Sequence, residues 1–239
     1  MRNEIYENQD NPQFTQATMS KTFMSNVFSY MTVALVVSGI AAYMFGTSDL
    51  IFMLYTETGS MSILGWVVML GPLGLIFLLG AKAQKFSYTT VLGIFILFAV
   101  LIGMSLSSIF IMYTDSSIVL TFVVTAGTFG VMAVLGYTTS TDLTQFGSIL
   151  KMAVIGLIIA MVANMFMHSG PLDYLISGIG VLVFTGLTAY DTQKLKQIGS
   201  VVDANSEEGK KASIMGALSL YLDFILLFQF LLSFLGSRD

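Results

Sequence analysis

The chain of 239 residues contains no cysteine, and it has only one histidine, one tryptophan and three prolines. Without cysteine it can form no disulfide, thiolate metal site or cysteine nucleophile, so the sequence does not reveal the redox compartment. Charged side chains are also few, at 10% of residues against 55% for hydrophobic ones, and the mean hydropathy is +0.83. Soluble domains do not have this composition, so we expect an integral membrane protein.

The charged residues occur in clusters, and most stretches between them reach the roughly 20 residues that a spanning helix needs. Two stretches on either side of Asp223 combine into one span, which leaves seven. The spans cover residues 22–48, 58–81, 86–114, 116–141, 152–172, 174–190 and 212–237, the sixth continuing past Asp191 to Gln193. We therefore predict an all-α membrane protein with a polar tail over residues 1–21 and one seven-helix domain over residues 22–237.

Basic residues lie on one side of these spans, which predicts the orientation of the chain. The first, third and fifth loops contain no Lys or Arg, and their charged residues and the only histidine are Asp49, Glu57, Asp115, Asp173 and His168. Nine basic residues lie in the tail and the even-numbered loops: Arg2, Lys21, Lys82, Lys85, Lys151, Lys194, Lys196, Lys210 and Lys211. The positive-inside rule then places the amino terminus in the cytoplasm and the carboxy terminus outside, with Arg238 as the one exception.

Several classes of function are not expected from this sequence. The net charge of -4 gives no reason to expect nucleic-acid binding. A lone His168, without a G-x-S-x-G element, does not support a zinc enzyme or an intramembrane protease, so we expect neither enzyme activity nor a cofactor. The acidic loop from Asp203 resembles the start of an EF-hand, but Glu208 and Ile214 occupy the positions that need Gly and Glu.

Glycines recur within three of the spans and predict faces where helix backbones approach closely in lipid. They lie in the second, fourth and sixth spans and are Gly71, Gly74, Gly80, Gly127, Gly130, Gly136, Gly178, Gly180 and Gly186.

Two aspartates, Asp191 and Asp223, lie inside or at the edge of spans and are the candidate functional residues. A carboxylate at the centre of a membrane costs at least ~2.5 kcal/mol on insertion scales, and such acids usually pair, line a water-filled path or titrate. Asp191 has an alternative interpretation, as an interfacial acid balanced by Lys194. Asp223 is too deep in its span for that interpretation.

The depths of the two acids allow them to meet. Asp191 lies 18 residues after Asp173, or ~27 Å along a helix that runs inward, and Asp223 lies 11 residues after Ala212, or ~16 Å along the returning helix. The difference shrinks if both helices extend beyond the bilayer on the cytoplasmic side. Two carboxylates in contact cannot both ionise cheaply, so a shared proton would make the pair a pH-sensitive latch.

Four segments in order resemble the Bax inhibitor-1 (transmembrane Bax inhibitor motif) family, bacterial branch, over nearly the whole chain from Lys21 to Leu235. They are LGPLGLIF in the second span, TFVVTAGTFGVMAVLGYTTSTDLTQFGSIL in the fourth, GLTAYDTQKLKQ in the sixth and GALSLYLDFILLF in the seventh. The resemblance implies a central seventh helix ringed by the other six and a pH-sensitive calcium leak. It also implies a paired-aspartate proton sensor at Asp191 and Asp223. Two features depart from the family: no arginine lies between Arg2 and Arg238, and Leu226 replaces a frequent asparagine.

The sequence therefore predicts a calcium-permeable, proton-regulated leak channel or transporter of the cytoplasmic membrane of a bacterium. Its partners would be the lipid bilayer, calcium ions and protons, and its two carboxylates would serve as transient calcium ligands as well as proton sensor. The alternative is an interaction protein that binds and restrains a membrane protease. That role would depend on the tail, residues 1–21, or on the loop over residues 194–211.

Overall fold

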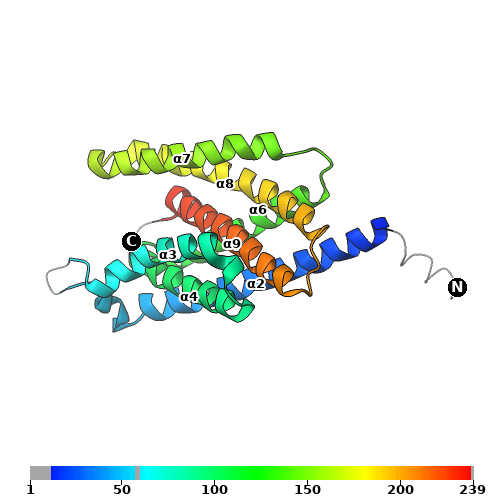
Figure 1. Ribbon diagram of the computed structural model, residues 1–239. Helices are drawn as coiled ribbons and strands as arrows, with labels where there is room; N and C mark the ends of the chain where they lie inside the picture. Colours follow the sequence, from blue (N-terminus) through cyan, green and yellow to red (C-terminus); the bar gives the residue numbers. More distant parts are fainter. Residues whose placement is uncertain (1–11, 57–59, 238–239) are drawn as a thin grey trace. The chain divides into compact units, whose positions relative to one another are not determined.

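The computed structural model describes residues 12–56 and 60–237, and the side chains of residues 12–15 are not part of that description. Arg2, Glu57 and Arg238 therefore lie outside the described residues. Figure 1 shows the helices in chain order. They are α2 (Pro12–Gly46), η1 (Asp49–Leu54), α3 (Ile63–Lys82), η2 (Ala83–Lys85), α4 (Tyr88–Leu106), α5 (Ile109–Met112), α6 (Asp115–Thr138), α7 (Thr144–Met167), α8 (Gly170–Gly199) and α9 (Glu207–Leu235).

Seven helices of the described part are long and apolar enough to cross a membrane, namely α2, α3, α4, α6, α7, α8 and α9. The predicted all-α class and the predicted number of spans are thus confirmed. α9 is the most buried of the seven, with 61% of its apolar window inside the protein against 17% for α7. A high buried share is what the predicted central position of the seventh span requires. α7 instead exposes large apolar side chains such as Ile159 and Phe166, which suits contact with lipid.

Helices α2, α8 and α9 extend further than their apolar stretches. α2 begins at Pro12, so residues 12–21 are helical, and residues 1–11 lie outside the described part. α8 continues to Gly199 and α9 begins at Glu207, which leaves only residues 200–206 between them. Lysines near a span end keep their amines in water while the helix continues. The charge clusters therefore mark the edge of the bilayer rather than the end of each helix.

The chain divides into two compact units, each described by itself. Unit 1 comprises residues 1–111 and 195–218, and within it α2 packs closely on α4. The Ser38 hydroxyl donates to the Ala99 carbonyl oxygen at 2.8 Å. The end of α8 rests on the start of α2, where the Ser20 hydroxyl donates to the Lys196 carbonyl oxygen at 3.0 Å. Unit 1 also contains the first turns of α9.

Unit 2 comprises residues 112–194 and 219–239, and it contains both candidate aspartates. Its core consists of α6, α7, most of α8 and the second half of α9. Aromatic rings join α9 to its neighbours: Phe230 stacks on Phe184 of α8, and Phe224 meets Phe129 of α6 edge to face. This packing places the two acids within one unit whose internal geometry is described.

The glycine prediction is right for the residues that face α8 or lie on it, and wrong for several others. A Cβ atom on Gly136 would collide with the Ala189 backbone, and one on Gly180 would lie 2.5 Å from the Phe230 ring. Gly186 likewise faces Leu150 of α7. By contrast Gly74, Gly80, Gly127 and Gly130 have no described atom of another element within 4 Å. Close packing by glycine is therefore concentrated on α8 within unit 2.

Candidate functional site

Within unit 2, α8 and α9 run antiparallel in a register fixed by two hydrogen bonds. Near one end, the hydroxyls of Ser177 and Ser233 share a hydrogen bond at 3.0 Å. Near the other, the Ser219 hydroxyl donates to Oδ2 of Asp191 at 2.6 Å. Ser177 and Asp191 are fourteen residues apart, as are Ser219 and Ser233, so the two helices stay in step along this length.

Asp223 lies one helical turn beyond Ser219 on α9. Four residues at 1.5 Å each put it ~6 Å further along the helix than the level of Asp191. Its side chain is 5% exposed, and its Oδ2 atom has no hydrogen-bond partner among the described residues. Ser219, one turn earlier on the same helix face, bonds Asp191, so the two acids lie about one turn apart in level. A buried carboxylate oxygen without a partner carries the full cost of lost hydration, which marks Asp223 as an unusual group.

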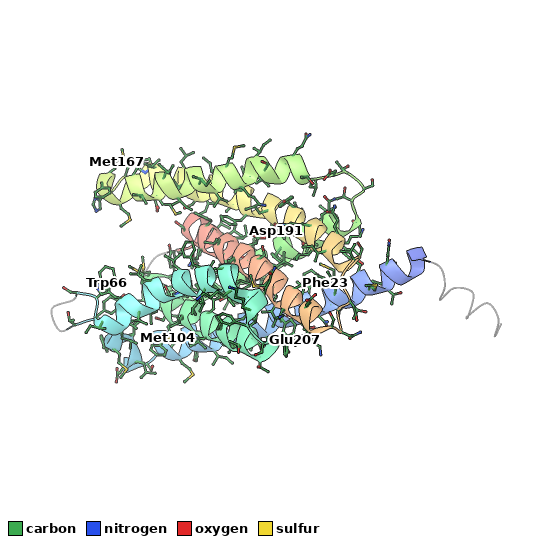
Figure 2. The ribbon with its side chains drawn as sticks, in the orientation of Figure 1. Phe23, Trp66, Met104, Met167, Asp191 and Glu207 are labelled. Carbon is green, nitrogen blue, oxygen red and sulfur yellow. The ribbon has the colours of Figure 1, made fainter. Side chains whose placement is uncertain are left out.

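The structure brings the two predicted site residues together on α8 and α9, but Asp191 has Ser219 as its hydrogen-bond partner (Figure 2 labels Asp191). The predicted latch consists of the two carboxylates in direct contact and does not include Ser219. A signal for it was present, because Ser219 precedes Asp223 by four residues and so shares its helix face. The two acids and this serine form what we call the aspartate site.

The aspartate site is not arranged as a resident metal centre. Among the described residues, no group of three or more His, Asp or Glu side chains is placed to hold a metal ion. Neighbouring Thr188 and Thr192 direct their hydroxyls to the carbonyl oxygens four residues earlier, at 2.8 and 2.7 Å. Calcium takes six to eight oxygen ligands, so two carboxylates would hold it only together with water or other oxygens.

A lysine that the sequence analysis placed in the fourth loop lies inside α7. Lys151 follows Thr144 by seven residues, ~10 Å into the helix. Its Nζ donates to the Tyr190 hydroxyl at 3.2 Å and lies 4.7 Å from the centroid of that ring. The ring packs directly on Gly147, where a Cβ atom would lie 2.5 Å from Cγ of Tyr190. The residue next to Asp191 is thus anchored on α7.

On the other side of Asp223, α9 is lined by phenylalanine rings. Phe224 and Phe228 both contact Phe122 of α6 edge to face, with ring centroids 5.6 and 6.3 Å apart. Further along, Phe230 stacks on Phe184 at 5.7 Å. The aspartate site is therefore followed, over ~15 Å up to Ser233, by an aromatic and apolar region. We call the rings of Phe122, Phe129, Phe184, Phe224, Phe228 and Phe230 the phenylalanine barrier.

Known proteins resemble this chain along almost its whole length. Residues 20–239 match the family described as inhibitor of apoptosis-promoting Bax1. The inner membrane protein YbhL of Escherichia coli (strain K12) is 44% identical over 219 residues, which are 91% of this chain and 92% of the relative. An uncharacterized protein of Borreliella burgdorferi is 42% identical over 216 residues, which are 90% of this chain and 92% of the relative.

A more distant relative, the uncharacterized protein YrjE of Lactococcus lactis, is 37% identical over 216 residues, or 90% of either chain. The matched lengths include α8, α9 and the aspartate site between them. Together with the seven apolar helices, these matches show an integral membrane protein, and the chain belongs to the Bax inhibitor-1 family.

Proposed function

We propose that this protein is a proton-regulated calcium leak channel or transporter, and that Asp191 and Asp223 form its proton sensor. The observation that carries the proposal is the buried Oδ2 atom of Asp223, which has no described hydrogen-bond partner and lies one helical turn from the serine that bonds Asp191. Unpaired acids inside a membrane protein are costly and usually mark an ion or proton pathway. No enzyme activity and no cofactor are part of the proposal.

The proton acts on the repulsion between the two acids. When both are ionised, two negative charges lie about one turn apart on facing helices in a poorly hydrated site, where repulsion is stronger than in water. A single bound proton removes that repulsion and lets α8 and α9 pack closely. Ionisation of both acids favours separation of the helices and entry of water and cations. Carboxylate oxygens are also the hard ligands that calcium prefers.

The phenylalanine barrier supplies the closed state of this pathway. An apolar constriction excludes water, and an ion that has lost its water cannot cross it. Phe230 rests against Gly180 and stacks on Phe184, so these two rings pack between α8 and α9 without a polar atom of their own. In the proposed mechanism, repulsion at the aspartate site loosens the helix pair on which this barrier depends.

Calcium entry into liposomes that contain the purified protein tests the proposal. Wild type, Asp191→Asn, Asp223→Asn and the double variant are compared from pH 5 to pH 8, with Asp115→Asn as a control at an exposed acid outside the site. We expect Asp223→Asn to lose much of the pH dependence of flux. The double variant should add little to either single change, because coupled groups are not additive. A wild-type pH profile in Asp223→Asn would contradict the proton-sensor mechanism.

Restraint of a membrane protease remains the alternative function. The sequence analysis linked it to residues 1–21 and to the loop over residues 194–211. Residues 1–11 lie outside the described part, and most of the second segment is helix, with residues 200–206 as the connection. The alternative would gain support if none of the aspartate variants changed flux while a truncated tail lost an interaction with a protease.

A further inference from the structure

A cavity of about 780 Å³ lies within unit 1, and neither aspartate lines it. It lies between the carboxy-terminal end of α3 with η2 and the first turns of α9. Its lining includes Leu79, Gln84, Val202, Glu208, Lys211 and Met215. The candidate spans that include α3 and α9 end at Lys85 and begin at Glu207, so we expect the cavity to lie near the boundary between hydrocarbon and water.

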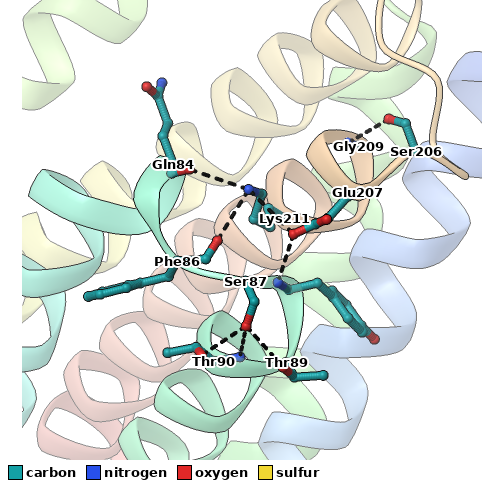
Figure 3. Close-up of polar contacts among 10 residues, drawn as sticks. Gln84, Phe86, Ser87, Thr89, Thr90, Ser206, Glu207, Gly209 and Lys211 are labelled. Carbon is teal, nitrogen blue, oxygen red and sulfur yellow. Dashed lines mark hydrogen bonds and ion pairs between the residues drawn. The ribbon is translucent and has the colours of Figure 1, made fainter.

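Hydrogen bonds beside the cavity join α9 to the loop between α3 and α4 (Figure 3). Nζ of Lys211 donates to the carbonyl oxygens of Gln84 and Phe86, at 3.4 and 3.2 Å. Oε1 of Glu207 accepts a hydrogen bond from the backbone N–H of Tyr88 at 3.3 Å. The same oxygen lies 3.8 Å from Nζ of Lys211. Because these contacts fix the amine of Lys211, its position does not depend on a ligand.

The lining offers one positive and one negative group above an apolar surface. Lys211 and Glu208 are three residues apart, so they lie on one face of α9. The side chain of Lys211 is only 14% exposed, which strengthens its interaction with an anion relative to a lysine in open water. Leu79 and Met215 supply the apolar part of the lining. A ligand that matches has an anion, a cation and an apolar remainder.

We propose that this cavity binds a phospholipid whose headgroup carries both a phosphate and a primary amine, the phosphatidylethanolamine class. The phosphate accepts from Nζ of Lys211 in place of Glu207, whose 3.8 Å ion pair is the longest of the lysine's contacts. The ammonium group donates to Glu208, and the glycerol with the first acyl carbons lies against Leu79 and Met215. A choline headgroup lacks N–H donors for Glu208, and a glycerol headgroup lacks the cation.

Native mass spectrometry of the full-length protein tests the assignment, with a readout independent of calcium flux. The protein is taken from vesicles of equal parts phosphatidylethanolamine, phosphatidylglycerol and phosphatidylcholine, and the retained lipids are counted. Wild type should retain phosphatidylethanolamine preferentially. Glu208→Gln should reduce that preference about tenfold, the factor expected when the hydrogen bond to the ammonium group loses its charge assistance. Lys211→Gln should reduce retention of all three lipids.

Lys210→Gln is the matched control, since this neighbouring amine lies 5.9 Å from the Tyr88 ring centroid and does not line the cavity. Its lipid preference should equal that of wild type. Glu208→Gln leaves the contacts of Lys211 and Glu207 intact. It therefore tests whether the cavity recognises the ammonium group even if the Lys211→Gln variant unfolds. Equal retention of the three lipids by wild type, or an unchanged preference in Glu208→Gln, would overturn the assignment. Displacement of the lipid by soluble glycerophosphoethanolamine at matched concentration would instead show a site for a soluble phosphate ester and would also overturn it.

Discussion

Replacing Gly136 by alanine should destabilise the packing of α6 on α8 next to the aspartate site. The added Cβ atom would collide with the carbonyl oxygen of Ala189 and would lie 2.8 Å from the carbonyl carbon. These are backbone atoms, which cannot rotate away as the end of a side chain can, so the two helices must separate. Overpacking of this kind costs about 1–3 kcal/mol. Ala189 lies two residues before Asp191, so the displaced segment includes the site.

Thermal unfolding of the purified protein in detergent measures the effect. For chains of this length, 1 kcal/mol corresponds to about 2–4 °C in Tm, so a cost near 2 kcal/mol should lower Tm by about 4–8 °C. Gly127→Ala is the matched control on the same helix, because no described atom of another element lies within 4 Å of its added Cβ. Its Tm should stay the same or rise slightly, since alanine favours helix. Equal Tm values for the two variants would refute the packing argument.

Two further predictions concern the loops. The side-chain hydroxyl and the backbone N–H of Thr144 both donate to Asp142, and they hold the pKa of that carboxyl group below its ordinary value. The ionised Asp142 carboxylate should therefore stabilise the protein above pH ~4, and this contribution should be lost as the pH falls through the lowered pKa. The difference in Tm between wild type and Asp142→Ala should then vanish in acid. A difference in Tm that stays constant with pH would contradict this prediction. The second prediction concerns topology: tags at the amino terminus and at Asn205 should be protected from external reagents, and a tag after Asp239 should react with them. Labelling of Asn205 from outside would show that the chain has the opposite orientation.

The spans could be predicted from the sequence because the bilayer imposes the same requirement on each of them. Every spanning helix needs a long apolar stretch, and charged residues interrupt these stretches at the membrane edge. The ends of the helices could not be predicted in this way. Lys151 and Lys194 are charged, so each marks the predicted end of a span. The helices α7 and α8 nevertheless include these two lysines. A lysine side chain reaches several ångströms to water or to a partner such as Tyr190, and the helix need not stop.

The partners within the site were less predictable than its acids. Asp191 and Asp223 stand out because carboxylates are rare in apolar spans. A serine does not stand out in an apolar span in this way, because its hydroxyl often bonds the carbonyl oxygen four residues earlier. The hydroxyl of Ser177 does so with Asp173. Whether Ser219 bonds its own helix or Asp191 depends on the neighbouring helix. The same dependence separates Gly136 from Gly130, which are alike in sequence and differ only in which one faces another backbone.

In the proposed mechanism, the absence of an arginine from the spans changes how the aspartate site would have to work. Successive residues on a helix point about 100° apart, and here Tyr190 turns to Lys151 on α7 while Asp191 turns to Ser219 on α9. The lysine amine is thus engaged by the tyrosine, and the group that bonds Asp191 is a neutral hydroxyl. A hydroxyl orients a carboxylate without cancelling its charge, whereas an arginine would do both. Repulsion between Asp191 and Asp223 therefore persists whenever both are ionised, which is the property that a gate operated by protons alone requires.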